Sequence, residues 1–445
     1  MTRRLAVIGG DAGGMSAAAQ ARRTDPSLEI VALEKSEWTS YSACGIPYVV
    51  SGVIDSIDEL VARSPQEHRD RSRIDVRTRH EVEAIDVAAG RLDVRDHGHA
   101  RTIQVPFDLL LLGMGARPIR PDVPGVDLPE VHGVQTLADA ASLLRRAEAS
   151  ECRNVVVVGA GYIGLEMAEA FVIRGARVTV VERGAHVMRT LDMEMAAPIE
   201  AAMRRIGIDL RLGVDVTGFE PGTVHTSVGS LPADVIVLGL GVEPNADLAA
   251  AAGIELGVRG AVHVNRRQET SVAGVYAAGD CAESWHIVSQ RPVHVALGTV
   301  ANRQGRVAGT NLGGGYATFP GVVGTAITKV CSTEVARTGL TEHEATTAGF
   351  AFVSATIDST TIAGYLPDAP AVTVKSLAER GSGRLLGAQI VGGQGAAKRI
   401  DVFATALHAG FTAQEVFDLD LSYAPPYSPL WDPITVSAKA LLAVL

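Results

Sequence analysis

One cysteine stands in a segment that allows it two different roles. Cys44 lies in the stretch YSACGIPYVVSG, from Tyr41 to Gly52, among small and apolar residues. Free cysteine is often a buried packing residue, and composition alone favours that role. The alternative is a nucleophilic thiolate, which needs surroundings that stabilise its charge. The segments before and after Cys44 decide between the two roles.

Two longer segments repeat one plan: a short apolar strand, a glycine-rich turn, an apolar helix, and a second strand that ends in glutamate. The first is RRLAVIGGDAGGMSAAAQARR followed by IVALEKS, with Glu34, and the second is RNVVVVGAGYIGLEMAEAFVIRGARVTVVERG, with Glu182. The glycines let the backbone approach a pyrophosphate, the helix N-terminus attracts its charge, and the acid accepts a hydrogen bond from a ribose hydroxyl. Two such βαβ units predict two dinucleotide sites. The phosphate-binding glycines are predicted to be Gly9, Gly13 and Gly14 in the first turn and Gly159, Gly161 and Gly164 in the second.

Two aspartates near these units carry further expectations. Asp11 occupies the middle glycine position of GGDAGG, where a carboxylate fits beside a pyrophosphate only if it points away. Asp280 follows a short apolar strand in GVYAAGDCAE, where it either binds a hydroxyl of a ribityl chain or caps a helix.

The remaining segments indicate how the chain is organised. LLLGMGARP (110–118) and VIVLGLGVEPN (235–245) are apolar strands ending in glycine, and we expect each to lead the chain from one domain to another. From about Gly324, the runs AFVSATI, AVTVKSL and GRLLGAQIVG alternate as strands of an antiparallel sheet with later helices. The sequence therefore predicts an α/β fold with a C-terminal α+β domain.

The composition excludes several classes of protein. With 445 residues, 47% of them hydrophobic, the chain is long enough for about three domains. Its net charge of −10 argues against nonspecific nucleic-acid binding. The four cysteines include no CxxC pair, which argues against a zinc cluster or a disulfide scaffold and fits a reducing compartment. No run approaches the ~18 apolar residues of a membrane span. We therefore expect a cytoplasmic protein without metal, nucleic-acid or membrane partners.

The order of these motifs resembles a known family over essentially the whole chain. Two βαβ units, the Cys44 segment between them, the AAGD stretch and the α+β region together resemble the flavoprotein pyridine nucleotide–disulfide oxidoreductases. The resemblance implies FAD in the first unit, NADH or NADPH in the second, and a homodimer. It implies two Rossmann-like dinucleotide-binding domains and a C-terminal α+β dimerisation domain: a split FAD-binding domain (1–115 and 246–323), an NAD(P)H-binding domain (116–245) and the dimerisation domain (324–445). Besides the glycines, the implied FAD-binding residues are Glu34, Lys35, Val82, Gly115, Asp280 and Ala296, and the implied NAD(P)H-binding residues are Glu182 and Arg183.

Within this family the chain is most similar to members with one redox-active cysteine. Cys44 has no CxxxxC partner, and SACGIPYVVSG resembles the coenzyme A–disulfide reductases. The family's oxidases and peroxidases usually carry a histidine in the first glycine turn, where this chain has Ala12. In the coenzyme A–disulfide reductases, the partner subunit supplies two tyrosines, and Tyr365 and Tyr423 match them in this chain. A second tyrosine usually follows the first one, where this chain has Leu366. The resemblance implies that Cys44, Tyr365 and Tyr423 are the catalytic residues.

The coenzyme A site of these reductases is matched in part. Ala43 and Ser72 stand where many members have asparagine and a basic residue. The implied activity is reduction of coenzyme A disulfide, or a related low-molecular-weight disulfide, through a mixed disulfide on Cys44. We expect that thiol near the start of a helix through GIPYVVSG, whose N-terminus favours the thiolate. The implied substrate-binding residues are Ser16, Gln20, Arg23, Ser40 and Asn302.

Several alternatives stay open on the sequence. An NAD(P)H oxidase or peroxidase would cycle Cys44 through sulfenic acid, and a polysulfide or persulfide reductase would use the same thiol on a smaller substrate. An electron-transfer reductase for a protein partner would not need Cys44, and a redox-sensing flavoprotein would not turn over. The nicotinamide is also open: Glu182 favours NADH, whereas Arg183 or Arg189 would bind the 2′-phosphate of NADPH.

Overall fold

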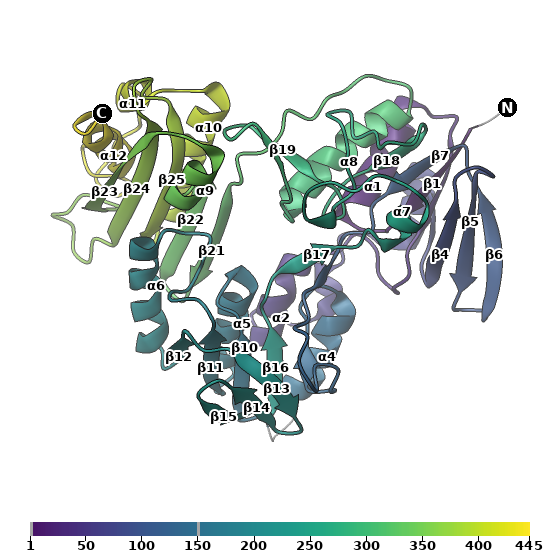
Figure 1. Cartoon of the computed structure of the whole chain (residues 1–445), viewed down its shortest axis with the longest axis horizontal. Helices are drawn as coiled ribbons and strands as arrows, with labels where there is room; N and C mark the ends of the chain where they lie inside the picture. Colours follow the sequence, from purple (N-terminus) through teal and green to yellow (C-terminus); the bar gives the residue numbers. More distant parts are fainter. Residues whose placement is uncertain (1–2, 149–151) are drawn as a thin grey trace.

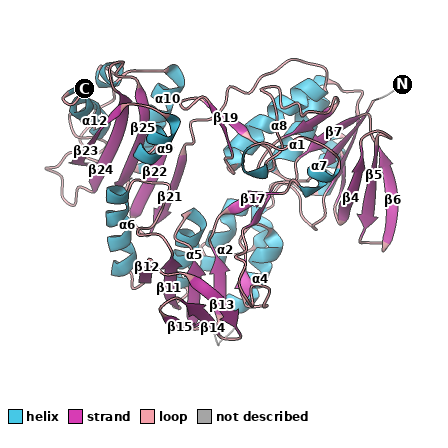
Figure 2. Cartoon of the chain, viewed as in Figure 1, coloured by secondary structure: helices cyan, strands magenta, loops and turns pink. Residues whose placement is uncertain are grey.

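The computed structural model describes residues 3–148 and 152–445, which form three lobes (Figure 1). Each lobe contains its own five-stranded β-sheet with helices packed against it, as the colours of Figure 2 show. Two of the sheets are parallel and the third is antiparallel. The α/β fold class expected from the sequence, with a C-terminal α+β part, is confirmed.

The first lobe is built on a parallel sheet of strand order β18-β7-β1-β2-β3. Its elements are β1 (Arg4–Ile8), α1 (Ala12–Thr24), β2 (Glu29–Leu33), α3 (Pro65–Ser72), β3 (Asp75–Arg77), β7 (Leu109–Leu112), α7 (Asp247–Ala251), β18 (Val275–Ala277), α8 (Gly298–Leu312) and an antiparallel meander of β4 (His80–Asp86), β5 (Arg91–Asp96) and β6 (Arg101–Pro106). The apolar run of β1 pairs on both sides, with β2 and β7, so its side chains are buried on both faces of the sheet. Strand β18 (Val275–Ala277) follows the whole second lobe in the sequence, so the chain returns from that lobe to complete the first sheet.

Helices α1 and α8 cross at very short range. A Cβ atom added at Gly305 would lie 2.4 Å from the carbonyl oxygen of Gly13, and one added at Gly309 would lie 2.3 Å from that of Ala17. Only glycine on α8 permits this approach, because a methyl group at either position would overlap the backbone of α1. The crossing fixes which side chains of the two helices face each other.

The second lobe repeats the parallel plan with strand order β12-β11-β10-β16-β9. Its elements are β9 (Val131–His132), α4 (Leu137–Ala147), β10 (Asn154–Val158), α5 (Tyr162–Ile173), β11 (Arg177–Glu182), α6 (Met193–Arg205), β12 (Asp209–Leu212), β16 (Val235–Leu238) and a meander of β13 (Val216–Glu220), β14 (Thr223–Thr226) and β15 (Gly229–Pro232). One helix of this lobe's core comes from the Cys44 segment. Ile46, Val49 and Val50 of α2 (Ile46–Ser51) are buried in the same apolar cluster as β10 and α5. The Cys44 segment is therefore anchored where the first two lobes meet.

The chain passes between the first two lobes twice, at one place. Strand β8 (Ala116–Pro118) leads out of the first lobe, and β17 (Val242–Pro244) leads back. The two strands pair with each other antiparallel, Ala116 opposite Pro244. Both passages were expected from the sequence, whereas their pairing was not.

The third lobe is an antiparallel sheet of order β21-β22-β25-β24-β23. It contains β21 (Ala326–Val330), β22 (Thr333–Gly339), α9 (Glu342–Ala348), β23 (Phe352–Thr360), β24 (Ala371–Glu379), β25 (Leu385–Gly392), α10 (Ile400–Ala409), α11 (Ala413–Phe417) and α12 (Pro433–Leu442), and it is preceded by a short ribbon of β19 (Ser284–His286) and β20 (Arg291–Val293). The three strands read from the sequence are β23, β24 and β25. The hairpin of β21 and β22 was not identified beforehand, and it packs its tip against the second lobe.

Candidate active site and cofactor sites

The two glycine turns adopt the same geometry. Gly9 and Gly159 have positive φ angles, 104° and 100°, which side chains rarely adopt. A Cβ atom at Gly14 would lie 2.0 Å from the carbonyl oxygen of Gly9, and one at Gly164 would lie 2.0 Å from that of Gly159. At Gly161 the nearest atom would be 3.9 Å away, so the second turn is open where a pyrophosphate would pass. This arrangement brings the N-termini of α1 and α5 to the ends of their strands, as a dinucleotide site requires.

The glutamate at the end of each second strand is held against its glycine turn. The Glu34 carboxylate accepts hydrogen bonds from the backbone N–H of Gly10 at 2.8 Å and Ser36 at 2.8 Å. The Glu182 carboxylate accepts from Ala160 at 2.9 Å and Gly184 at 2.7 Å. Each oxygen then has one donor and one remaining lone pair, so a ribose hydroxyl can still donate to it. The carboxylates thus shape the turns in addition to the role expected of them.

The side chain of Asp11 points away from the glycine turn. Its Oδ1 accepts a hydrogen bond from the backbone N–H of Tyr41 at 3.1 Å, which ties the turn to the Cys44 segment. Burial, the largest cause, raises the pKa of Asp11 to about 6, and the Glu34 carboxylate adds to it. An acid therefore fits at this position, because its carboxylate points away from the place expected for the pyrophosphate.

The residues expected at a flavin lie around the carboxyl end of the first sheet. Burial raises the pKa of Asp280 to about 6. In the part of the chain that the structure describes, no hydrogen bond to this carboxyl offsets the loss of water around it. A ribityl hydroxyl would supply such a donor, so Asp280 fits FAD chemically. Gly279, next to it, donates its N–H to Gln304 Oε1 at 2.8 Å. The other expected residues lie on β4 (Val82, buried), directly after Glu34 (Lys35, exposed), between β7 and β8 (Gly115) and before α8 (Ala296); their contacts with FAD stay predictions.

Cys44 lies on a single 3₁₀ turn, Ala43–Gly45, that leads directly into α2. Its position before a helix agrees with the sequence analysis, and its side chain is exposed. The expected charge effect is not found. Protein atoms packed around the sulfur are the largest cause of a raised pKa, and the carboxylates of Glu166 and Asp280 raise it further. A helix of six residues does not outweigh them, so the free thiol is favoured over the thiolate in the protein alone.

A pocket of about 460 Å³ gathers most of the predicted substrate-binding residues. Ser16 and Arg23 come from α1, Asn302 from α8 and Ser40 from the loop after β2, and Ser16 Oγ donates to Asn302 Oδ1. Gln20 does not line the pocket but accepts a hydrogen bond from Arg23 at 3.0 Å, which positions that guanidinium. The full lining is Asp11, Ala12, Met15, Ser16, Ala19, Arg23, Ser40, Tyr41, Ser42, Ala62, Arg63, His68, Asn302 and Arg306.

Three residues of this pocket were missed in the sequence. Arg63 and Arg306 add two positive charges beside Arg23, and no motif marks either of them. His68 is only 2% exposed, and its Nε2 lies 2.9 Å from Ser40 Oγ. Its Nδ1 is buried without a hydrogen-bond partner in the part of the chain that the structure describes, and burial lowers the pKa of this histidine. Ser40 itself has a φ of 51°, so the loop that carries it is held in an uncommon conformation.

Tyr365 and Tyr423 are brought together on the third lobe. They lie in loops before β24 and before α12, and they are 74% and 47% exposed. The pKa of Tyr365 is raised. Desolvation is the larger cause, and a hydrogen bond with Tyr423 is the next. Tyr427, Leu430 and Trp431 are exposed near Tyr423 in the same tail. A group of large exposed apolar side chains marks an interaction surface more often than it marks free solvent-facing surface.

Comparison with known proteins identifies the family. Residues 3–305 match the description "Pyridine nucleotide-disulphide oxidoreductase", and residues 325–433 match the dimerisation domain of the same family. The chain belongs to the pyridine nucleotide–disulphide oxidoreductases. It is therefore an FAD- and NAD(P)H-dependent oxidoreductase, as the resemblance in the sequence implied.

Curated relatives cover the whole chain. An NAD(P)H sulfur oxidoreductase (CoA-dependent) from Pyrococcus furiosus is 38% identical over 444 residues, 99% of either chain. An NADH oxidase from Methanocaldococcus jannaschii is 33% identical over 99% of either chain. A coenzyme A disulfide reductase from Staphylococcus epidermidis is 29% identical over 96% of either chain. These relatives place the chain among reductases of disulfides and persulfides.

Solved structures agree with the fold. Reduced CoADR-RHD from Bacillus anthracis superposes with a TM-score of 0.97 at 33% identity, over 100% of this chain and 81% of the other. An NAD-dependent persulfide reductase from A. fulgidus gives 0.95 at 36% identity, over 99% and 83%. An engineered water-forming NADPH oxidase bound to NADPH gives 0.95 at 25% identity, over 99% and 98%. In the described residues no helix is long and apolar enough to cross a membrane, and no group of acidic, histidine and cysteine side chains is arranged to hold a metal.

Proposed function

We propose that this enzyme reduces coenzyme A disulfide, or a closely related phosphate-bearing disulfide, at Cys44. The pocket that joins α1, α8 and the Cys44 segment carries the proposal. It offers Arg23, Arg63 and Arg306 to phosphates, and its wall at Tyr41 and Ser42 leads to the cysteine. Guanidinium groups bind phosphate through paired, charge-assisted hydrogen bonds. The basic charge that Ser72 does not supply is thereby provided by other residues.

The chemistry at Cys44 is thiol–disulfide exchange. The Cys44 thiolate attacks one sulfur of the substrate, a new disulfide forms to Cys44, and the other half leaves as a thiolate that takes a proton. Two electrons that originate from NAD(P)H then reduce the mixed disulfide, release the second thiol and restore the thiolate. FAD, held by the first glycine turn with Glu34 and Asp280, supplies the two-electron relay between nicotinamide and sulfur when it is bound. The raised pKa of Cys44 disfavours its free thiolate. We expect the mixed disulfide as the resting form.

The tyrosines support a site shared between two subunits. Tyr365 and Tyr423 lie on the lobe that matches the dimerisation domain, on an exposed aromatic surface. We expect each pair to reach Cys44 of the partner chain, where a phenol can donate to a sulfur or orient the ligand. Heterodimers made from Cys44→Ser and Tyr365→Phe/Tyr423→Phe chains should recover part of the activity that each homodimer lacks. Absence of recovery in purified heterodimers would count against the shared site.

A second function is favoured by the relatives that act on sulfur chains. A polysulfide or persulfide would use the same thiol. The A. fulgidus protein is described as a persulfide reductase, and the Pyrococcus furiosus protein as a CoA-dependent sulfur oxidoreductase. The oxidase alternative is less favoured, because Ala12 stands where a histidine would stabilise a sulfenic acid. The pocket supports a coenzyme A disulfide over an inorganic polysulfide, since an inorganic polysulfide has no phosphate for the three arginines to bind.

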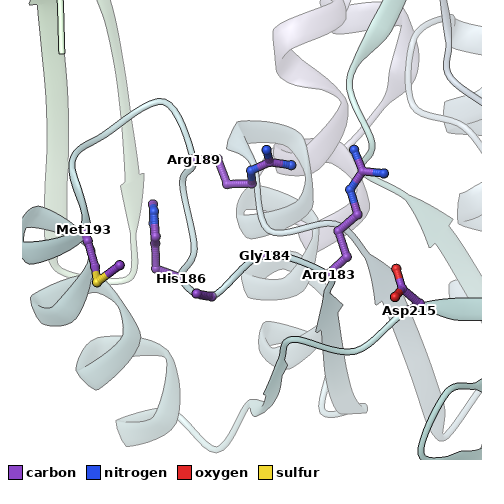
Figure 3. A pocket seen from close by; sticks show the side chains of 7 residues that line it. Arg183, Gly184, His186, Arg189, Met193 and Asp215 are labelled. Atoms are coloured by element: carbon purple, nitrogen blue, oxygen red, sulfur yellow. The ribbon is translucent and has the colours of Figure 1, made fainter. Parts of the chain in front are cut away.

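The nicotinamide side of the enzyme has a useful precedent. The engineered NADPH oxidase is described as carrying an aspartate changed to alanine, the next residue changed to arginine, and another arginine introduced six positions later. In this chain Glu182 is followed directly by Arg183, and Arg189 stands six residues after it. The spacing of the two arginines, which line one pocket (Figure 3), matches, whereas the acid that the engineered protein lost is kept in this chain as Glu182.

Steady-state assays with several substrates test the proposed function. NAD(P)H oxidation is measured with coenzyme A disulfide, with pantetheine disulfide, which lacks the nucleotide phosphates, with polysulfide, with oxygen and with peroxide. Arg306→Ala should raise KM for coenzyme A disulfide about tenfold, since a hydrogen bond to a charged group contributes about 1.5–3 kcal/mol. It should leave KM for pantetheine disulfide unchanged. Arg303→Ala, an exposed arginine of α8 outside the pocket, is the matched control. Faster turnover with polysulfide or peroxide than with any disulfide would refute the proposal.

A further inference from the structure

We propose that Arg399 is a positioning residue of the shared active site, because its guanidinium holds together the two segments that carry Tyr365 and Tyr423. The inference rests on the proposed function, in which both tyrosines act at the partner subunit's Cys44. The contacts of Arg399 are with the backbone of the two segments, and the tyrosine side chains depend on that backbone for their place.

The two tyrosines come from irregular segments that are far apart in the sequence. Tyr365 lies in the loop between β23 and β24, and Tyr423 lies in the tail between α11 and α12. One backbone hydrogen bond joins the loop directly to the tail, from the N–H of Ala363 to the carbonyl of Pro425 at 2.9 Å. Both tyrosine side chains are exposed, so packing against their own lobe does not fix them. Their relative position therefore depends on what anchors the two backbones.

The guanidinium of Arg399 lies between these two segments. Its Nη2 donates to the carbonyl of Thr361 in the loop at 2.7 Å and to the carbonyl of Tyr427 in the tail at 2.8 Å. This nitrogen carries two protons, so both hydrogen bonds form at the same time. Each of these carbonyls lies four positions from the tyrosine of its own segment. One nitrogen atom therefore sets the distance between the loop and the tail.

Arg399 is itself fixed on the third lobe. It ends a 3₁₀ turn, Ala397–Arg399, that leads directly into α10. Its side chain is 11% exposed, and its Nε lies 3.1 Å from Asp432 Oδ2. That carboxylate also accepts hydrogen bonds from Ser428 Oγ at 2.9 Å and from the backbone N–H of Ile434, in the first turn of α12, at 2.9 Å. The tail is thus tied to the guanidinium through a carboxylate as well as through a carbonyl.

The fork shape of arginine is what this place requires. A guanidinium presents five N–H donors in fixed directions, whereas lysine presents one ammonium group on a flexible stem. A lysine would keep the charge that pairs with Asp432, but one nitrogen cannot bond this carboxylate and both carbonyls in the same geometry. Arg399→Lys should therefore loosen the tyrosine segments while the lobe stays folded. If that chain does not fold, Arg399→Gln/Asp432→Asn takes its place, since it leaves no charge unpaired.

Two heterodimers that contain the same substitutions in different arrangements test the inference. In the first, one chain carries Cys44→Ser and the other carries Arg399→Lys, so the remaining Cys44 meets tyrosines from a chain whose Arg399 is intact. It should keep about half of the wild-type activity with coenzyme A disulfide, because one of two symmetric sites is complete. In the second, one chain carries both substitutions and its partner is wild type, so the remaining Cys44 meets misplaced tyrosines. Its kcat/KM should be about tenfold or more below that of the first, since misplacing a group by about 1 Å can cost about 100-fold.

A structural defect would give a different pattern. If Arg399→Lys damaged its own chain, the first heterodimer would be the less active one, because its only Cys44 lies in the damaged chain. Equal activities, or a lower activity of the first heterodimer, would overturn the inference. The same two arrangements made with Tyr365→Phe/Tyr423→Phe in place of Arg399→Lys test the shared site itself. No difference between them would refute that part of the proposed function, whereas a difference with the tyrosine variant alone would refute only the role of Arg399.

Three controls separate positioning from loss of stability. Adding Arg399→Lys to the Tyr365→Phe/Tyr423→Phe homodimer should lower kcat/KM by less than about twofold, because a positioning residue acts only through the groups that it positions. A further tenfold loss would overturn the inference. Anaerobic reduction of the flavin by NAD(P)H needs neither tyrosine and should keep its rate in Arg399→Lys. Lys398→Met removes the neighbouring lysine, which is 75% exposed, and should leave both heterodimers unchanged.

Discussion

Lys375 holds the second and third lobes together, and its removal makes a quantitative prediction. Its side chain is 1% exposed on β24, and its Nζ lies 2.9 Å from Asp192 Oδ2 and 2.9 Å from Glu342 Oε1. A third carboxylate, that of Glu194, also forms a salt bridge with Lys375 Nζ. Burial lowers the pKa of Lys375, but the three carboxylates outweigh that effect and raise it above the ordinary 10.5. We predict that Lys375→Met strongly destabilises the protein.

The size of the effect follows from what the substitution leaves behind. Three carboxylates would face one another without their cation, and breaking a buried ion pair on one side costs about 3–5 kcal/mol. For a domain of about 150–250 residues, each kcal/mol shifts Tm by about 2–4 °C, so the expected loss is about 6–20 °C. Lys329→Met is the matched control, because Lys329 is 47% exposed in its pair with Glu169. Exposed pairs contribute about 0–1 kcal/mol, and the control should lose no more than about 4 °C.

Differential scanning calorimetry at neutral pH measures both variants, with Lys375→Met/Asp192→Leu as a third. The double variant should recover part of the loss, since it removes the most buried carboxylate left unpaired. A lysine whose pKa is raised stabilises the fold below its unfolded-state pKa, and the effect is lost as pH rises through the folded-state value. The difference in Tm between the wild type and Lys375→Met should therefore be constant between about pH 6 and about pH 9. It should shrink above about pH 10.5, where the lysine loses its charge. If Lys375→Met melts within about 2 °C of the wild type, the reasoning is refuted, because burial would then cancel the ion pairs.

Three further predictions concern the cofactor and substrate sites. Asp280→Ala should purify with at most about a tenth of the FAD content, since one hydrogen bond accepted by a buried carboxylate contributes about 1.5–3 kcal/mol. Asp280→Asn should retain more FAD, as measured by the flavin absorbance. In the reduced enzyme, where Cys44 is a free thiol, Glu166→Gln should lower the pKa of Cys44. Below that pKa it should speed alkylation by iodoacetamide about threefold, equivalent to about half a pKa unit. Glu169→Gln should not, because Glu169 is not among the main causes of that pKa, and equal rates would exclude Glu166 as a cause. Gly305→Ala should separate α8 from α1 and weaken both FAD retention and coenzyme A disulfide binding. An unchanged KM for coenzyme A disulfide would show that the crossing does not position the substrate pocket.

Much of the framework could be predicted because it depends on local patterns. The turn at Gly9 and its counterpart at Gly159 need glycine for their positive φ angles, and each is followed by a helix and an acid at fixed spacing. Local order of this kind can be read along a single chain. The strands after Gly324 were found by their alternation, but the hairpin of β21 and β22 was not, because its short runs resemble loop sequence.

The rest of the site could not be predicted, because it depends on contacts between distant segments. Arg63 and Arg306 belong to no motif, and only the crossing of α8 over α1 brings Arg306 to the pocket. The pKa of Cys44 was expected to be lowered by the helix that follows it. Glu166, which lies 122 positions later in the chain, raises that pKa instead. Its place beside the thiol follows from the packing of α2 on α5. Electrostatics of this kind is a property of the assembled lobes.

The paired strands β8 and β17 have a consequence for how the gene can be rearranged. Because Ala116 lies opposite Pro244, the two ends of the intervening segment are neighbours in space. A segment whose ends meet can be exchanged for another of different length without stretching the sheet that contains its attachment points. We expect chimaeras that exchange residues 119–241 for the matching segment of a relative to fold, provided that the new segment keeps the surface that contacts α2. Such exchanges offer a route by which nicotinamide preference and disulfide preference can change independently during evolution.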